Sequence, residues 1–117
     1  MRTTLYGLKN CDTCRNAVQW LREQNIDVTL HDLRADGLDE ELLDKWLSDL
    51  GWESLLNRRS TTWRQLEDNE REELNADKAR KLLIAHPTLI KRPLIQLNGR
   101  WIVGYSEARY ATLLAGA

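Results

Sequence analysis

The sequence predicts an α/β fold in which a mixed four-stranded sheet is flanked by helices. Three observations predict it: a β-α-β pattern opens the chain, a helical block fills residues 38–87, and Asn98-Gly99 between two apolar runs marks a β-hairpin, which a last helix follows. The 117 residues suffice for one modest core. We therefore expect a single domain over 1–117, with the helices of 38–87 inserted between the N-terminal β-α-β unit and the C-terminal hairpin and helix.

The first half of the sheet comes from the N-terminal β-α-β pattern. Residues 3–6 form a short β-prone run that Gly7 ends, and alternation of apolar and polar residues over 27–33 predicts a half-buried strand. Between them, apolar residues recur at helical spacing and predict a helix to about residue 24: Ala17, Val18, Trp20 and Leu21. Strands joined in this way pair in parallel.

The helical block begins where Asp39 is a candidate N-cap, and Gly51 ends its first helix. Four segments follow: a short helical piece at 52–56, a basic loop at 58–64, a solvated and partly helical stretch at 65–74, and a helix at 77–86 that Pro87 helps to end.

The second half of the sheet is the hairpin, with strands at 94–97 and 101–103, followed by a helix that starts at Ser106. Pro93 directly precedes the first of these strands, and we expect that strand to lie at the sheet edge. The complete order of elements matches a thioredoxin-like core with a large helical insertion.

Composition narrows the class of protein. The formal charge of -1 gives no general attraction to nucleic acid or to an anionic membrane. No apolar run approaches the roughly 20 residues that span a bilayer, and the N-terminus lacks the apolar region of a secretory signal. We expect a small cytoplasmic monomer.

Both cysteines of the chain lie in one Cys11-x-x-Cys14 pair, between the first strand and the first helix. A thiol at a helix N-terminus loses its proton readily, and the thiolate is the nucleophile. Cys14 can then resolve the adduct formed at Cys11, and Arg15 adds positive charge nearby. Two alternatives remain open: an unreactive pair in a helix turn, and a zinc site. The only further histidine candidates, His31 and His86, lack paired spacing, so we expect no metal.

Arg92-Pro93 is a second informative stretch. Pro93 can hold a sharp turn, and Arg92 can project toward an anion. A basic residue before an edge strand is usually just solvated, however, and the same holds for Arg58, Arg59 and Arg64.

Four motifs, in order along nearly the whole chain, carry a family resemblance. They are Asn-Cys-Asp-Thr-Cys-Arg-Asn at 10–16, Leu-Leu-Asn-Arg-Arg-Ser-Thr-Thr-Trp-Arg at 55–64, His-Pro-Thr-Leu-Ile-Lys-Arg-Pro-Leu-Ile at 86–95 and Val-Gly-Tyr-Ser-Glu at 103–107. The chain resembles the family of glutaredoxin-coupled arsenate reductases and Spx regulators, most of all its short YffB-like branch. The resemblance implies a thioredoxin-like fold with a helical insertion and a cis peptide bond at Pro93.

The resemblance also implies roles for single residues. Cys11 occupies the position of the nucleophile, and Arg92 that of the anion-binding arginine before the proline. A second arginine follows the Leu-Leu stretch, and its spacing to Thr-Thr-Trp-Arg favours Arg59 over Arg58. Two departures weigh against arsenate as the substrate: Gly104 stands where the arsenate reductases have a third arginine, and Cys14 where they have serine.

For the YffB-like branch the resemblance implies a glutathione-dependent thiol-disulfide reductase. It would have no bound cofactor, glutathione as co-substrate, and a disulfide or oxyanion as substrate, and the family also admits glutaredoxin as a partner. Asn10, Arg15, Arg59, Arg92 and Pro93 would form the binding site beside the cysteines. Two alternatives stay open: an Spx-like regulator that docks on RNA polymerase and is switched by a cysteine disulfide, and an arsenate reductase proper.

Overall fold

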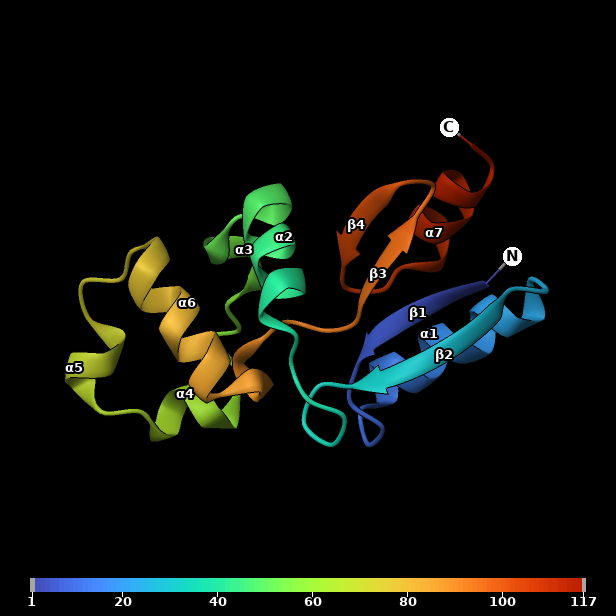
Figure 1. Ribbon diagram of the computed structural model, residues 1–117. Coiled ribbons are helices and arrows are strands. Elements are labelled where there is room, and N and C mark those ends of the chain that lie inside the picture. The colour runs from blue at the N-terminus through green and yellow to red at the C-terminus, as the bar shows by residue number, and fades with distance from the viewer. Residues whose placement is uncertain (1, 117) are drawn as a thin grey trace. The chain divides into compact units, whose positions relative to one another are not determined.

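A computed structural model describes residues 2–116 of the chain (Figure 1). These residues form two compact units, one of residues 2–36 and 92–116 and the other of residues 37–91. Each unit is described by itself. The prediction of one domain over 1–117 stays a prediction.

The first unit is a mixed four-stranded sheet with helices, as the sequence predicts. Its strands are β1 (Arg2–Gly7), β2 (Asp27–Asp32), β3 (Leu94–Leu97) and β4 (Arg100–Val103), in the order β2-β1-β3-β4. β1 and β2 are parallel, and the other two pairs are antiparallel. One expectation is wrong: β3 is an inner strand. The prediction treated the hairpin alone and missed the pairing of β3 with β1, which removes it from the edge.

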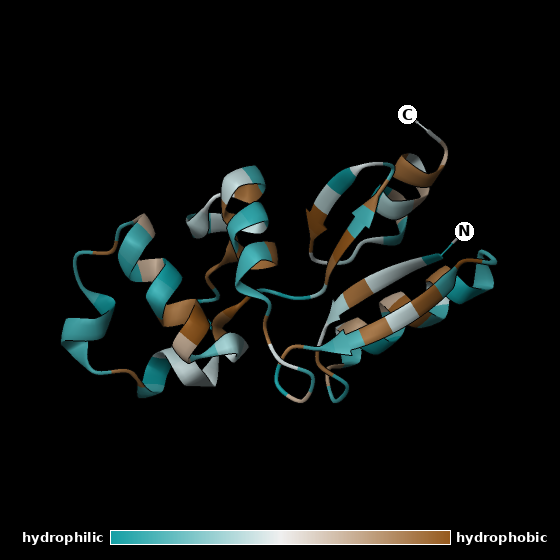
Figure 2. Ribbon diagram, in the orientation of Figure 1, coloured by the Kyte–Doolittle hydropathy of each residue, from teal (hydrophilic) through white to brown (hydrophobic). Residues whose placement is uncertain are grey.

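Two helices cover one face of this sheet, α1 (Asp12–Glu23) and α7 (Glu107–Leu114). Apolar residues recur along α1 and the strands between hydrophilic ones (Figure 2). Leu21 of α1, Ile95 of β3 and Tyr110 of α7 are fully buried in the same core. Burying such side chains contributes about 1.5–3 kcal/mol each, so this core fixes α1, and with it the cysteine loop, on the sheet.

The parallel pairing brings two chain ends to one edge of the sheet. Gly7 at the end of β1 pairs with Asp32 at the end of β2, and the N–H of Leu33 donates to the Gly7 carbonyl at 2.9 Å. The cysteine loop, residues 8–11, leaves β1 at this edge. The end of β2 is therefore the natural support for that loop.

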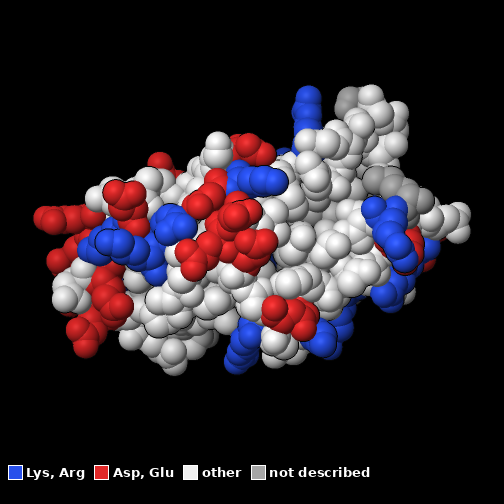
Figure 3. Space-filling model, viewed as in Figure 1, with Lys and Arg blue, Asp and Glu red and all other residues white. Residues whose placement is uncertain are grey.

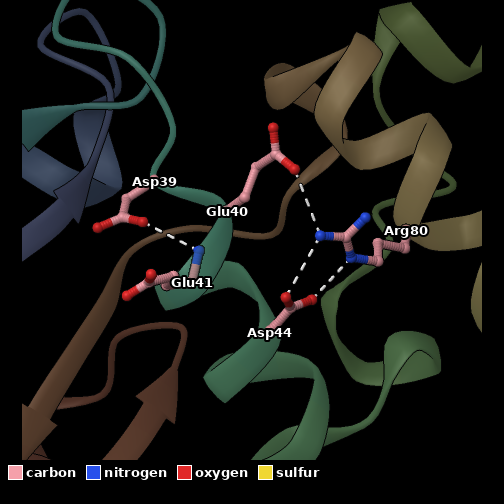
Figure 4. Close-up of polar contacts among 5 residues, drawn as sticks. All are labelled: Asp39, Glu40, Glu41, Asp44 and Arg80. Atoms are coloured by element: carbon pink, nitrogen blue, oxygen red, sulfur yellow. Dashed lines mark hydrogen bonds and ion pairs between the residues drawn. The ribbon is translucent and has the colours of Figure 1, made fainter.

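The second unit is helical. Its elements are α2 (Glu40–Leu50), α3 (Trp52–Leu55), α4 (Thr61–Gln65), α5 (Asp68–Arg71), α6 (Ala76–Ala85) and a 3-10 turn, η1 (Pro87–Leu89). Asp39 caps α2 as predicted, accepting from the N–H of Glu41 at 2.9 Å. The guanidinium of Arg80 on α6 binds Glu40 and Asp44 on α2, which ties the two helices together (Figure 4). Acidic and basic side chains interleave over these helices (Figure 3).

The basic stretch 58–64 is not entirely the predicted loop, because α4 begins within it at Thr61. The hydroxyl of Ser60 accepts from the N–H of Trp63 at 3.2 Å and caps the helix. The Arg58 guanidinium lies over the Trp63 ring, 5.9 Å from its centroid. The charge of the stretch obscured this N-cap signal.

Between residues 2 and 116, none of the helices combines the length and the apolar composition that crossing a bilayer requires.

Candidate active site

Cys11 is the N-cap residue of α1, as the sequence predicts for a residue at the helix N-terminus. Its backbone is extended, with φ -101° and ψ 120°, and its N–H donates to the Leu8 carbonyl at 3.2 Å. Its side chain is partly exposed and does not cap the helix with a hydrogen bond. The sulfur thus lies near the unpaired N–H groups of the first helical turn, which favour a negative charge.

The surroundings of Cys11 favour its thiolate. Partial burial opposes ionisation, but the nearby backbone N–H and thiol of Cys14 and the guanidinium of Arg92 outweigh it, so the pKa of Cys11 lies below its ordinary value. Since the thiolate is the form that attacks sulfur or an oxyanion, Cys11 is the nucleophile that this geometry supports.

The pKa of Cys14 is shifted in the opposite direction. Its side chain is fully buried, and burial, together with the neighbouring Cys11 sulfur, raises the pKa of Cys14 to about 12, although the backbone N–H of Leu8 acts in the other direction. At neutral pH Cys14 is therefore a thiol that donates toward Cys11.

Gly7 makes the space that Cys14 occupies. A β-carbon at Gly7 would lie 2.4 Å from the Cys14 sulfur, closer than unbonded atoms approach, and 3.3 Å from the Cys14 β-carbon, a tight contact. The glycine is thus required by packing against the buried thiol.

Replacing Gly7 by alanine should therefore destabilise the first unit and displace Cys14. We expect a loss of roughly 1–3 kcal/mol in the free energy of unfolding, the usual cost of overpacking a core. Urea unfolding of Gly7→Ala beside Gly7→Ala/Cys14→Ala measures it. The second change removes the sulfur, so it should recover much of the loss; no recovery would show that the strain lies elsewhere.

Arg92 approaches the cysteines from the far end of the chain. The Arg92-Pro93 bond is cis, as the family resemblance implies, Pro93 is buried, and its carbonyl accepts from the N–H of Gly104 at 2.8 Å. The half-buried Arg92 guanidinium interacts with the Cys11 sulfur. The reading of Arg92 as merely solvated is thereby set aside.

Asp32 supports the cysteine loop and was not anticipated. Among the residues that the structure describes, it is the only polar or charged one that is buried, with 7% of its surface exposed. One carboxylate oxygen accepts from the N–H of Lys9 at 2.9 Å, and the other from Arg34 and Ala35, both at 2.8 Å. Because the Leu8 carbonyl on the same peptide accepts from the N–H of Cys11, Asp32 fixes the loop that places the nucleophile.

The pKa of Asp32 is lowered, chiefly by the backbone N–H of Lys9 and then of Ala35. Since its folded pKa lies below the unfolded one, its stabilisation is present above the unfolded value near pH 4 and is lost as pH falls through the folded pKa. Asp32→Asn should cost about 1–3 kcal/mol at pH 7. Urea unfolding at pH 7 and at pH 3 should show this gap shrinking at the lower pH; a constant gap would contradict the assignment.

The remaining predicted site residues are divided between the two units. Asn10 and Arg15 lie beside Cys11 along the chain, both exposed, and Arg15 pairs with Asp12. Arg58 and Arg59 belong to the second unit, where with Lys91 they help line a pocket of about 530 Å³. The role of Arg59 at the cysteines stays a prediction.

Two supporting residues escaped the sequence analysis. Gly7 was read only as a strand end, and Asp32 only as a polar position of a strand. The signal for both was the parallel pairing itself, because the carboxyl ends of parallel strands meet at one edge. Among residues 2–116, no group of three or more His, Cys, Asp or Glu side chains is arranged to hold a metal ion.

Comparisons with known proteins match nearly the whole chain. A model of the ArsC family matches residues 6–113. An uncharacterized protein of Haemophilus influenzae is 44% identical over 112 residues, covering 96% of this chain and 98% of the relative. The global transcriptional regulator Spx 2 of Bacillus anthracis is 30% identical over 105 residues, covering 88% of this chain and 79% of the relative.

A solved structure, that of a protein named YFFB, has the same fold. It superposes with a TM-score of 0.89 at 41% identity, covering 96% of this chain and 98% of the other. The four-stranded sheet and its helices are thus shared along nearly the whole length, which confirms the predicted thioredoxin-like fold.

Proposed function

Because the chain belongs to the ArsC family, we propose that it is a glutathione-dependent thiol-disulfide reductase with Cys11 as its nucleophile. The observation that carries the proposal is the lowered pKa of Cys11, whose sulfur interacts with Cys14 and with Arg92. A thiolate held by a guanidinium and a helix N-terminus is built to attack an electrophilic sulfur.

The first step is a thiol-disulfide exchange. The Cys11 thiolate attacks one sulfur of a substrate disulfide, a sulfur–sulfur bond forms between them, and the substrate's own bond breaks. The other half of the substrate leaves as a thiolate and takes a proton from solvent. Cys11 is then held in a mixed disulfide. This step involves no net oxidation or reduction, because one disulfide bond has replaced another.

Glutathione is proposed to resolve this intermediate. The glutathione thiolate attacks the mixed disulfide and releases Cys11; a second exchange with another glutathione yields glutathione disulfide, so two electrons pass from two glutathiones to the substrate. The Cys14 thiol, with a pKa raised to about 12, is almost wholly protonated at neutral pH and fully buried. These two properties favour a supporting role for Cys14 over attack on the intermediate.

The anion site explains why glutathione suits the protein. Arg92 is a planar donor beside the sulfur, and its guanidinium can bind a carboxylate of glutathione when Cys11 is in a disulfide and no longer charged. The exposed Asn10 and the loop N–H groups would hold the rest of the tripeptide. Arg59 is proposed as a second anion ligand on the family resemblance alone.

The assay that tests the proposal supplies purified protein with a small mixed disulfide of glutathione. We expect turnover with glutathione as the reductant and much slower turnover with the same concentration of cysteine, which lacks the second carboxylate. Equal rates with both thiols would contradict the glutathione preference. Replacing the disulfide by arsenate separates this reaction from arsenate reduction, for which Gly104 leaves the third arginine missing.

A second candidate function rests on the 30% identity to Spx 2, a transcriptional regulator. In that case a Cys11–Cys14 disulfide would switch binding to RNA polymerase. Capture of purified RNA polymerase by the reduced and oxidised protein tests it. Binding that changes with oxidation, combined with no turnover of the disulfide, would replace the enzyme proposal.

A further inference from the structure

A groove runs along α1 on the side of the edge strand β2, next to the cysteine loop. It has a volume of about 630 Å³ and is lined by residues from the cysteine loop, the length of α1 and Leu30 of β2. Lys9, two residues before Cys11, lies at one end of this lining, and Arg22, in the last turn of α1, at the other. All of the lining belongs to the first unit.

The charges of this groove are unequal. Three lining residues are cationic and exposed, and only one is acidic. The cations are Lys9, Arg15 and Arg22, and the acid is Glu23. The Arg15 side chain contacts Asp12, and Arg22 donates to the Val28 carbonyl at 3.2 Å. The Arg15–Asp12 pair is exposed and weak, and the Val28 carbonyl does not neutralise the charge of Arg22, so the groove attracts negative charge.

Its floor between the arginines is apolar. Val18 of α1 and Leu30 of β2 lie there, the first 7% exposed and the second half-buried. A ligand that fits must therefore carry two anionic groups with an apolar group between them.

The spacing identifies the kind of ligand. Arg15 and Arg22 are seven residues apart on one helix, which places their backbones roughly 10 Å apart. In an extended peptide every second side chain lies on the same face, and four residues span roughly 13 Å, a distance that the long arginine side chains can cover. Two acidic side chains four positions apart, with an apolar one midway between them, would lie on one face of the peptide and match both arginines and the floor.

We propose that this groove binds an extended acidic peptide segment of a protein disulfide substrate and thereby presents its cysteine to Cys11. The inference rests on the proposed function for the reaction, but the binding itself does not need it. The substrates would be proteins whose reactive cysteine lies next to an acidic stretch, because the groove extends from Lys9, beside the nucleophile, toward Arg22.

The test uses three labelled peptides, each with one cysteine as a mixed disulfide with glutathione. The acidic peptide is Cys-Ser-Glu-Ser-Val-Ser-Glu, and the other two carry glutamine or lysine in place of both glutamates. Fluorescence anisotropy with the full-length Cys11→Ser protein measures binding without turnover. We expect the acidic peptide to bind roughly tenfold tighter than the glutamine peptide, and the difference to disappear in 0.5 M salt.

Variants then locate the binding. Arg22→Glu should abolish the preference for the acidic peptide, and Gln19→Glu, which adds a negative charge to the groove without removing a hydrogen bond, should do the same if Arg22→Glu fails to fold. Arg100→Glu, at an exposed arginine of β4 outside the groove, is the matched control and should leave the preference intact.

The outcomes separate the two proposals. Equal affinity for the acidic and glutamine peptides, or an equal loss in Arg100→Glu, overturns the groove proposal, even if the wild-type protein reduces all three peptides. A preference that Arg22→Glu or Gln19→Glu removes supports the groove, even if no peptide is turned over and the reductase proposal fails.

Discussion

Replacing Cys11 by serine should reduce turnover of a glutathione mixed disulfide to the uncatalysed rate. A serine hydroxyl stays protonated at neutral pH and cannot form the mixed disulfide, so the covalent route is lost completely. The steady-state rate of glutathione disulfide formation, coupled to its reduction, measures the effect.

The matched control for this variant is Cys14→Ser. A serine hydroxyl can still donate toward the Cys11 sulfur from the buried position, so most of the activity should remain. If Cys14→Ser were as inactive as Cys11→Ser, Cys14 would be the resolving thiol, and the proposed role of glutathione in that step would be wrong.

Arg92→Ala should have the second largest effect. It removes the guanidinium that favours the Cys11 thiolate, so the pKa of Cys11 should rise. A hydrogen bond to a charged group contributes about 1.5–3 kcal/mol, so kcat/KM at pH 7 should fall roughly 10–100-fold. Its pH profile gives the measurement.

We expect the deficit in kcat/KM of Arg92→Ala to shrink as pH rises. Below the pKa of the variant's thiol the deficit is large, because wild-type Cys11 is ionised and the variant's is not. At higher pH both thiols ionise and the deficit should shrink to the part due to anion binding. Arg100→Ala, at an exposed arginine of the same unit, should behave as wild type. A deficit in Arg92→Ala that is constant with pH would remove Arg92 from thiolate stabilisation.

The sequence predicted those parts of the fold that local signals determine. Asn98-Gly99 placed the hairpin, Asp39 and Ser106 placed two helix starts, and the Cys-x-x-Cys pair placed the nucleophile at a helix N-terminus. Each of these is a property of a few consecutive residues. The family motifs added Arg92 and the cis bond before Pro93, which no local pattern reveals.

What the sequence did not predict depends on contacts between distant segments. The inner position of β3 follows from its pairing with β1, about 90 residues earlier in the chain. Asp32 looks like any polar strand residue until the parallel register places it beside the loop of Lys9. Gly7 looks like a strand stop until Cys14 fills the space that its missing side chain leaves.

The difference between the two cysteines is of the same kind. The sequence assigned Cys11 as the nucleophile from its place at the helix N-terminus, but it did not predict the complete burial of Cys14. Burial of Cys14 in the first turn of α1 raises its pKa, whereas at Cys11 the effect of partial burial is outweighed by Cys14 and the guanidinium of Arg92, which lower the pKa. The asymmetry of the pair is thus a property of the fold.

The pH dependence of alkylation at each cysteine tests this asymmetry most directly. Iodoacetamide labelling of the reduced protein from pH 4 to 11, with mass spectrometry to assign the site, follows the two thiols separately. We predict that Cys11 is labelled with a midpoint below that of an ordinary thiol and that Cys14 stays unlabelled throughout while the protein is folded. Labelling of both cysteines with one ordinary midpoint, or of Cys14 first, would contradict the account of Cys11 as the activated nucleophile.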